Sequence, residues 1–413
     1  MTVARELAAS VERPTAAVAT GPFVCMVAYS DYVFDARIRR EAETLVACGF
    51  RVSCLKLRNG STRQHHVLNG VEVRELSVPK YQGKSRAAYI RSYVRFLLEA
   101  SVECVRRLSR GELDVVHIHN LPDFLVGVGL IPRLFGRKVV LDVHDSVPET
   151  FATKFSSASM IWRLLCLEEQ LSARMAHRVI CVNHPQRDTL VARGLAKDKT
   201  FVSMNVPDPA IFRRQAPVRR PLNANETFDI VYHGTMAHRL GVDLAIRAIA
   251  RVRRDVPNAR LHLWGRGDDL AEFQKLAADM QVSDIVEFQP RGYPLQELPA
   301  RLGRMHLGVI GNRQTVAGDL MLPVKLMEYV ALGIPVVAPR LRTIEHYFTR
   351  EMVSFYEPES VQSLADAICR LSIDADARYS QAVAASRFLD EYGWERQGGQ
   401  LVGLYQQLLE MTS

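Results

Sequence analysis

Short apolar runs of strand length alternate with longer amphipathic stretches along almost the whole chain. Val-, Ile- and Leu-rich runs that are each followed by a helical pattern are typical of parallel sheets covered by helices on both faces. The expected strands form two sets: Phe23–Ala28, Arg51–Leu57, Asp114–His119, Lys138–Val143, Arg178–Val182 and Phe201–Val206, then Ile230–His233, Ala259–Trp264, Ile285–Phe288, His306–Ile310 and Ile334–Ala338. The alternation therefore predicts an α/β chain with two Rossmann-like sheets.

The length of 413 residues also favours two domains, because a single hydrophobic core rarely grows that large. We expect an N-terminal domain over 21–210, a polar linker over 211–225, a C-terminal domain over 226–393 and a final helix over 394–413. Residues 1–20 lack the apolar core of a signal peptide and are predicted to be a flexible tail. Ligands of such sheets bind at the carboxyl ends of the strands, so the substrates are expected in a cleft between the domains.

The formal charge of +8 is unevenly distributed. Residues 1–215 hold 31 Lys and Arg against 21 Asp and Glu, whereas the remainder holds 22 against 24. A basic half suggests an anionic partner, either a phosphate-bearing substrate or an acidic membrane surface. No nucleic-acid-binding module is visible, so nucleic acid is not an expected partner. The seven scattered cysteines, none in a C-x-x-C pair, indicate reduced thiols and a cytoplasmic location.

Residues 322–338 are the most informative stretch. Pro323 suits the first turn of a helix and Gly333 suits its end, with a strand following. The start of a helix offers free N–H groups and a positive dipole end, which favour a diphosphate. Lys325 adds positive charge in the first turn, and the carboxylate of Glu328 could accept hydrogen bonds from two ribose hydroxyls.

This stretch resembles the signature of the retaining group 1 glycosyltransferases, and the resemblance extends over nearly the whole chain. It implies the GT-B fold: an acceptor-side domain, a nucleotide-sugar domain facing it across a cleft, and a C-terminal helix that crosses back to the first domain. It further implies that Glu328 holds the donor ribose and that Leu322 and Lys325 line the donor site. The family's second Glu, eight positions earlier, is replaced by Leu320. The alternative interpretation is an amphipathic surface helix with a Lys/Glu pair.

A second segment, 231–243, resembles the loop that opens the family's nucleotide-binding domain. The family's diphosphate-binding Arg and Lys are replaced here by Thr235 and Leu240, and Arg239 lies one residue away. We therefore predict that Arg239 and Lys325 bind the diphosphate, with the backbone of Gly234 and Thr235 close to a phosphate.

The turn 265–268 matches the family's G-x-G turn, so Gly265 and Gly267 are also predicted to contact the donor. Ordinary turn chemistry is the alternative, because a lone G-x-G is common.

On the acceptor side, residues 142–145 resemble the family's D-x-H-E element, with Asp145 in place of Glu. His144 ends a strand and could hydrogen-bond a sugar hydroxyl or accept a proton; a structural histidine is the alternative. His117 and His119 share one face of the preceding strand by alternation. We expect His119 and Asn120 to face the acceptor and His117 to belong to the core.

Asp35 and Arg37 open a helix in a pattern that resembles the family's D-x-R helix start beside the acceptor pocket. Asp35 is explained as an N-cap, and Arg37 is predicted to contact the acceptor or the donor.

No metal and no cofactor are expected. The histidines lack H-x-x-x-H or facial-triad spacing, and the one D-x-D considered, 374–376, is predicted to begin a helix, unlike the strand-end D-x-D of metal-dependent GT-A enzymes. In the GT-B fold a helix dipole and cationic side chains carry the diphosphate charge.

The predicted function is the transfer of a hexose from a nucleotide-diphosphate sugar to a glycan or lipid-linked saccharide of the cell envelope. Two alternatives stay open: a sugar-nucleotide epimerase of the same fold, and a non-catalytic nucleotide-sugar-binding partner in polysaccharide assembly. In the expected helix 86–108, Arg91 and Arg95 lie on one side together with Lys84 just before it. This is either an ordinary solvated face or a peripheral contact with an anionic membrane.

Overall fold

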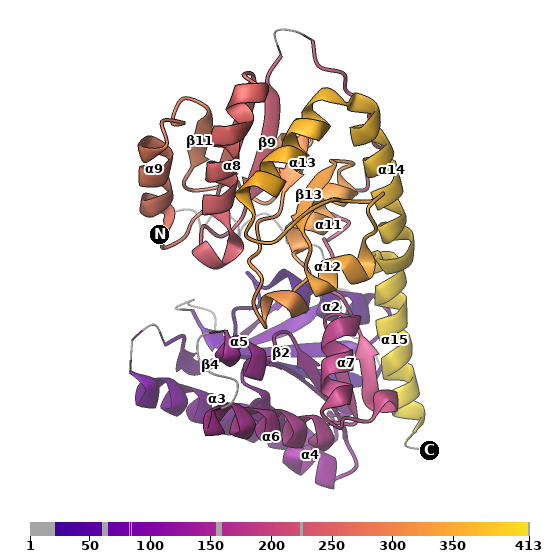
Figure 1. The fold of residues 1–413 in the computed structure, drawn as a ribbon. Helices are drawn as coiled ribbons and strands as arrows, with labels where there is room; N and C mark the ends of the chain where they lie inside the picture. Colours follow the sequence, from indigo (N-terminus) through magenta and orange to yellow (C-terminus); the bar gives the residue numbers. More distant parts are fainter. Residues whose placement is uncertain are drawn as a thin grey trace. The chain divides into compact units, whose positions relative to one another are not determined.

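The computed structural model describes residues 21–59, 65–81, 83, 85–153, 159–223 and 226–411. They form two compact units: the described residues up to Met204 together with those from Gln397 onward, and Asn205–Arg396 (Figure 1). The predicted tail 1–20, Lys84 and the last two positions of the predicted linker lie outside the described residues.

Unit 1 is built on an eight-stranded sheet in the order β3-β4-β2-β1-β5-β6-β7-β8. Every neighbouring pair is parallel except β3 with β4. The strands are β1 (Phe23–Ala28), β2 (Arg51–Arg58), β3 (His65–Leu68), β4 (Val71–Pro79), β5 (Val115–His119), β6 (Lys138–Val143), β7 (Arg178–Cys181) and β8 (Thr200–Val202).

The helices of unit 1 connect these strands. They are α2 (Ala36–Ala47), α3 (Arg86–Ser109), the 3₁₀ helix η1 (Asp123–Gly129), α4 (Leu130–Leu134), α5 (Val147–Ala152), α6 (Met160–Met175), α7 (His184–Ala192) and the 3₁₀ helix η2 (Lys197–Lys199). Asp35 caps α2 by accepting from the Ile38 N–H at 3.3 Å, which confirms its predicted N-cap role. The last helix, α15 (Trp394–Glu410), continues from unit 2 and belongs to unit 1 from Gln397 onward, as the predicted crossing helix should.

Unit 2 has a six-stranded, all-parallel sheet in the order β11-β10-β9-β12-β13-β14. Its strands are β9 (Phe228–His233), β10 (Ala259–Trp264), β11 (Val286–Gln289), β12 (Leu307–Val309), β13 (Val336–Pro339) and β14 (Ser354–Tyr356). Its helices are η3 (His238–Leu240), α8 (Val242–Asp255), α9 (Leu270–Asp279), α10 (Leu298–Leu302), η4 (Gly318–Leu320), α11 (Val324–Ala331), α12 (Arg342–Tyr347), α13 (Val361–Ile373) and α14 (Ala375–Tyr392). Asp374 caps α14, accepting from the Ala377 N–H at 2.8 Å, so the D-x-D does begin a helix.

In each sheet the chain runs outward in both directions from a central pair of strands, β1 and β5 in unit 1 and β9 and β12 in unit 2. Such a switch point leaves a crevice at the carboxyl ends of the two strands, where ligands of these sheets bind. The loops that follow these four strands therefore position the candidate sites.

The described part of the stretch predicted as a linker, 211–225, packs within unit 2. Residues from Asn205 onward belong to unit 2. Gln215 donates its N–H to the Ala331 carbonyl at 2.8 Å, and a Cβ on Gly333 would lie 3.0 Å from the Cα of Pro217. The stretch thus packs against the end of α11.

Candidate functional site

Lys325 is the central residue of the candidate site in unit 2. It lies in the first turn of α11, close to Gly234, where a Cβ would come within 3.3 Å of its Nζ. Gly234 adopts φ +115° at the end of β9, a conformation that favours glycine. Because residue 234 is a glycine, its backbone can approach the ammonium group of Lys325 closely.

The ammonium of Lys325 is buried and has no hydrogen-bond partner among the described residues. Its stem is partly exposed, and its Nζ lies 3.7 Å from the ring centroid of Tyr232. Burial lowers the pKa of Lys325 to about 7; the positive charge of Arg239 lowers it too, and Glu328 opposes both. An unpartnered buried cation at a helix start is an arrangement that an anionic ligand would complete.

Glu328 lies one turn further along α11, with 14% of its side chain exposed. Its Oε2 lies 2.6 Å from Nε2 of His233, and Nδ1 of His233 lies 2.9 Å from the hydroxyl of Tyr329. Among the described residues no hydrogen bond or ion pair of the other carboxylate oxygen is found. His233, which the sequence analysis missed, orients Glu328 and leaves one oxygen for a ligand.

The G-x-G turn supports the loop after β9. A Cβ on Gly265 would lie 1.8 Å from the Gly234 carbonyl oxygen, and one on Gly267 would lie 1.9 Å from that of Met236. The Gly234 N–H donates to the Trp264 carbonyl at 2.8 Å, so this N–H is not available to a phosphate. Because Gly265 and Gly267 have no side chain, the loop after β10 can pack directly against the loop after β9. Direct contact of Gly234, Gly265 and Gly267 with the donor stays a prediction.

Arg239 is exposed, and so is Thr235 in the preceding turn; Leu322, just before α11, is half-buried. A further residue that the sequence analysis missed, Arg313, holds the turn that carries Arg239. Its Nε donates to the His238 carbonyl at 2.9 Å, and its NH2 pairs with Asp243 Oδ2 at 2.6 Å. Its own N–H donates to the Arg239 carbonyl at 3.2 Å.

The crevice of unit 1 is organised by Asp142, a fully buried carboxylate at the end of β6. Its Oδ1 accepts from NH2 of Arg37 at 2.5 Å, and Arg37 also faces Glu41 Oε1 at 3.4 Å. The Arg37 guanidinium holds the pKa of Asp142 well below its usual value against the opposing effect of burial. Arg37 is itself buried, so this ion pair accounts for it within the fold; its contact with a substrate stays a prediction.

Three histidines gather on the other oxygen of Asp142. Its Oδ2 lies 3.1 Å from His119 Nδ1, 3.1 Å from His144 Nε2 and 3.7 Å from His117 Nε2. His144 keeps 20% of its side chain exposed, whereas His119 and His117 are buried. Of the three, His144 is therefore placed to meet a ligand. His117 belongs to the core, as predicted, and its Nδ1 lies 2.5 Å from the hydroxyl of Tyr405 in α15.

Asn120 joins the ends of β5 and β6. Its Nδ2 donates to Asp123 Oδ1 at 2.7 Å and to the Asp145 carbonyl at 2.9 Å, and its Oδ1 accepts from the His144 N–H at 2.7 Å. With its amide used in this way, Asn120 holds His144 and Asp145 in place. The Asp145 side chain is exposed and stays a predicted acceptor contact.

That the protein needs no metal also stays a prediction. The fold brings four potential metal ligands together although their spacing in the sequence did not indicate a metal site. Glu41, His117, His119 and Asp142 each offer one ligand atom, all within 4.8 Å of one another. The guanidinium of Arg37 already bonds to both carboxylates of this group. This fixed cation disfavours a metal ion at the same place by like-charge repulsion.

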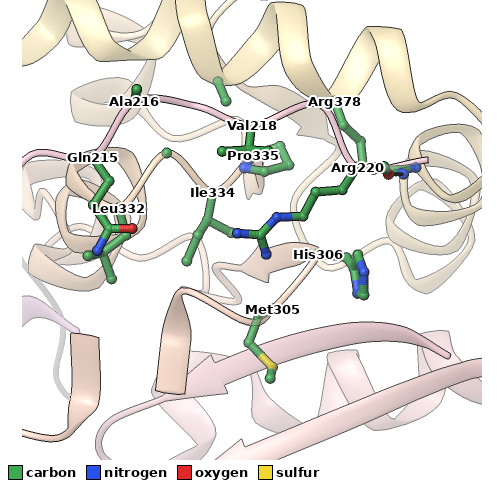
Figure 2. Close-up of a pocket in the computed structure, with 12 residues that line it drawn as sticks. Gln215, Ala216, Val218, Arg220, Met305, His306, Leu332, Ile334, Pro335 and Arg378 are labelled. Atoms are coloured by element: carbon green, nitrogen blue, oxygen red, sulfur yellow. Dashed lines mark hydrogen bonds between the residues drawn. The ribbon is translucent and has the colours of Figure 1, made fainter. Parts of the chain in front are cut away.

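A separate cavity, shown in Figure 2, lies at the amino-terminal ends of β12 and β13, whereas the candidate site lies at the carboxyl ends of the strands. It is lined by residues that precede β12 and β13, among them His306 and Pro335, and by Arg220 and Arg378. Its volume of about 40 Å³ accommodates only a few water molecules. The cavity is therefore not a candidate substrate site.

Two family models match the chain. The model described as Glycosyl transferase 4-like domain matches residues 35–205, and the model described as Glycosyl transferases group 1 matches residues 227–374. The first match lies within unit 1 apart from its last residue, and the second lies within unit 2.

Curated relatives match over part of the chain. GDP-mannose-dependent alpha-(1-6)-phosphatidylinositol monomannoside mannosyltransferase of Mycolicibacterium smegmatis is 29% identical over 202 residues, which is 48% of this chain and 52% of that protein. One of the subunits of phosphatidylinositol N-acetylglucosaminyltransferase from Arabidopsis thaliana is 26% identical over 254 residues, 61% of this chain and 53% of that protein. The chain thus spans about half the length of these relatives.

Solved structures match over almost all of the chain. Sucrose-phosphate synthase from Thermosynechococcus elongatus is 18% identical with a TM-score of 0.77, covering 94% of this chain and 100% of that chain. HepE from Anabaena, solved in complex with UDP, is 16% identical with a TM-score of 0.69, covering 94% of this chain and 100% of that chain. These structures establish the fold.

Proposed function

Because the chain belongs to the group 1 glycosyltransferases and has their GT-B fold, we propose that it transfers a hexose from a nucleotide-diphosphate sugar to a saccharide acceptor. The observation that carries the proposal is the buried, unpartnered ammonium of Lys325 at the start of α11. A donor diphosphate would supply its missing partner, with Arg239 as the second cation.

In this proposal Glu328 binds the donor ribose. Its free oxygen accepts from a ribose hydroxyl, while His233 at 2.6 Å fixes the orientation of the carboxylate. A carboxylate that is already held needs to lose less rotational freedom on binding, so the contact favours the donor more strongly.

The proposed transfer retains the anomeric configuration and needs no metal. As the bond between the sugar and the diphosphate breaks, Lys325, Arg239 and the N–H groups at the start of α11 stabilise the charge on the leaving diphosphate. The acceptor hydroxyl forms the new bond to the anomeric carbon and gives its proton to a donor phosphate oxygen. His144 orients a sugar hydroxyl from the partly exposed end of the Asp142 cluster.

For the acceptor we propose a lipid-linked saccharide or glycolipid, reached from the cytoplasmic face of a membrane. Two relatives are named for acceptors built on phosphatidylinositol. The basic surplus of residues 1–215 suits an acidic lipid surface. Within the described residues no helix is both long enough and apolar enough to span a bilayer.

The test is a thermal-shift screen with UDP, GDP, ADP and their sugars, followed by transfer assays with the donor that binds. A ligand that binds only the native state raises the melting temperature by mass action. A product with the donor's anomeric configuration would support retaining transfer. Epimerised donor in the absence of acceptor would indicate an epimerase, and tight binding without turnover would indicate a non-catalytic partner.

A further inference from the structure

Three helices of unit 1 direct large apolar side chains outward. Of the 23 large hydrophobic residues exposed in the described part of the chain, five lie on α3, four in or just after α4 and five on α6. We call these fourteen residues the apolar face. Isolated exposed hydrophobic residues are ordinary, but fourteen of them on helices that pack around η1 mark an interaction surface.

Helix α6 shows the pattern most clearly. Met160, Leu164, Leu167 and Leu171 are 70%, 56%, 49% and 56% exposed and recur at the spacing of one helical face. The buried residues of the same helix are Glu169, Ser172 and Ala173. The outward stripe therefore presents large apolar side chains where an ordinary surface helix carries polar ones.

The other two helices extend the same surface. On α3, Ile90, Val94 and Leu98 recur every fourth residue and are 61%, 44% and 58% exposed, and at the end of α4 Leu134 and Phe135 are 76% and 69% exposed. The 3₁₀ helix η1 packs against both α3 and α6, and α4 packs against α3. The three helices are thus gathered around η1 in unit 1, where Figure 1 labels α3, α4 and α6.

The charges exposed on α3 and α6 have one sign. Among the described residues of these helices, the exposed charged side chains are all arginines: Arg91, Arg95 and Arg106 on α3, and Arg163 and Arg174 on α6. The acidic residues of α3 and α6 are buried or half-buried. Apolar side chains bordered by arginines complement a bilayer interface, where acyl chains lie beneath anionic headgroups.

We propose that the apolar face seats unit 1 on an anionic lipid bilayer, with α3, α4 and α6 lying in the interface and the arginines reaching lipid phosphates. The inference rests on the proposed function, because a lipid-linked acceptor is met at such a surface. It extends the basic stripe expected from the sequence: Arg91 and Arg95 are exposed, although Arg95 also pairs with Glu99 at 2.9 Å. A second copy of the chain is the other occupant that such a face could take, and the experiment separates the two.

The experiment is flotation of the full-length protein with vesicles of phosphatidylcholine alone or with phosphatidylglycerol added. The wild type should float with the acidic vesicles and much more weakly with the neutral ones. Replacing Leu164, Leu167 and Leu171 together by serine should lower the lipid-bound fraction at least tenfold. The matched control replaces Val218, Leu295 and Ile373, exposed apolar residues of unit 2, by serine and should float like the wild type.

Two further measurements separate this proposal from the proposed function. The leucine variant should keep its melting temperature and its nucleotide binding, and it should transfer sugar normally to a short, water-soluble acceptor while losing transfer to an acceptor embedded in vesicles. A wild type that binds no vesicles, or a control that loses flotation equally, would overturn the membrane proposal. A wild-type dimer that the leucine variant converts to a monomer, without lipid binding, would assign the face to a second copy. Failure to bind any nucleotide sugar would count against the proposed function alone.

Discussion

Replacing Lys325 by methionine should change the stability of the empty protein and its response to ligand in opposite directions. The folded protein holds this amine at a pKa of about 7 against an ordinary value of 10.5, mainly because it is buried. Each unit of difference corresponds to about 1.4 kcal/mol, so carrying the charge in the empty crevice costs several kcal/mol. The cation–π contact with Tyr232 offsets about 0.5–2 kcal/mol of this cost.

We therefore expect Lys325→Met, which keeps the stem and removes the charge, to stabilise the empty protein by about 2 kcal/mol at pH 7, once the lost cation–π contact is subtracted. For a unit of this size such a change raises the melting temperature by roughly 4–8 °C. A nucleoside diphosphate should then bind at least tenfold more weakly, because each lost charge-assisted hydrogen bond contributes about 1.5–3 kcal/mol.

Calorimetry without ligand and titration with a nucleoside diphosphate and with the bare nucleoside would measure both effects. Lys275→Met, at an exposed lysine of α9, is the control and should change neither. The reasoning is refuted if Lys325→Met destabilises the empty protein, since the ammonium would then support the fold. It is equally refuted if nucleoside and nucleoside diphosphate lose the same affinity.

Other consequences can be measured on the same protein. Glu328→Gln should weaken donor binding by roughly 10- to 100-fold with the fold intact, and a 2′- or 3′-deoxy donor should lose little further affinity with the variant; normal transfer by the variant would remove Glu328 from the site. Because Lys325 must be protonated to bind a diphosphate strongly, affinity should fall as pH rises above about 7, approaching tenfold per pH unit, and a bare nucleoside should show no such slope. The same depressed pKa means that the unfolded chain binds more protons between pH 7 and 10.5, so stability of the empty protein should rise with pH there. Asp142→Asn should cost about 3–5 kcal/mol in urea unfolding, since it leaves Arg37 buried with a weaker partner, whereas an unchanged midpoint would show that this pair does not organise unit 1. Chelators should leave donor binding and transfer unchanged; loss restored by a divalent metal would contradict the metal-free proposal.

Most of the fold was accessible from the sequence because the buried parallel strands are continuous apolar runs. Strands β1, β6 and β10 have the predicted bounds. The strands that sequence reasoning missed, β3, β4 and β14, lie at sheet edges or next to them. Strand β4 alternates buried and half-buried residues over part of its length, and β14 has only three residues, Ser354–Tyr356, so neither gives a long apolar run.

The site residues likewise fall into two groups: those found from a local sequence pattern and those brought together only by the fold. A helix start after a proline and a Lys/Glu pair can be read from a local pattern, so Lys325 and Glu328 were found. Their supporting partners come from distant parts of the chain: His233 is 95 residues from Glu328, and Asp142 is 105 residues from Arg37. No local pattern gives these contacts, because each joins a strand end to a helix that only the fold brings next to it.

Unit 1 is assembled from two separate stretches of the chain, one at each end, and this affects the order in which the protein folds during synthesis. A ribosome delivers the chain from its N-terminus. His117, at the centre of the first sheet, nevertheless contacts the hydroxyl of Tyr405, which follows it by 288 residues. Unit 2, by contrast, is one uninterrupted segment, Asn205–Arg396. The second unit can therefore complete its folding during synthesis, whereas the first lacks the packing of α15 until that helix has emerged. The unit that is synthesised first is the last to be finished.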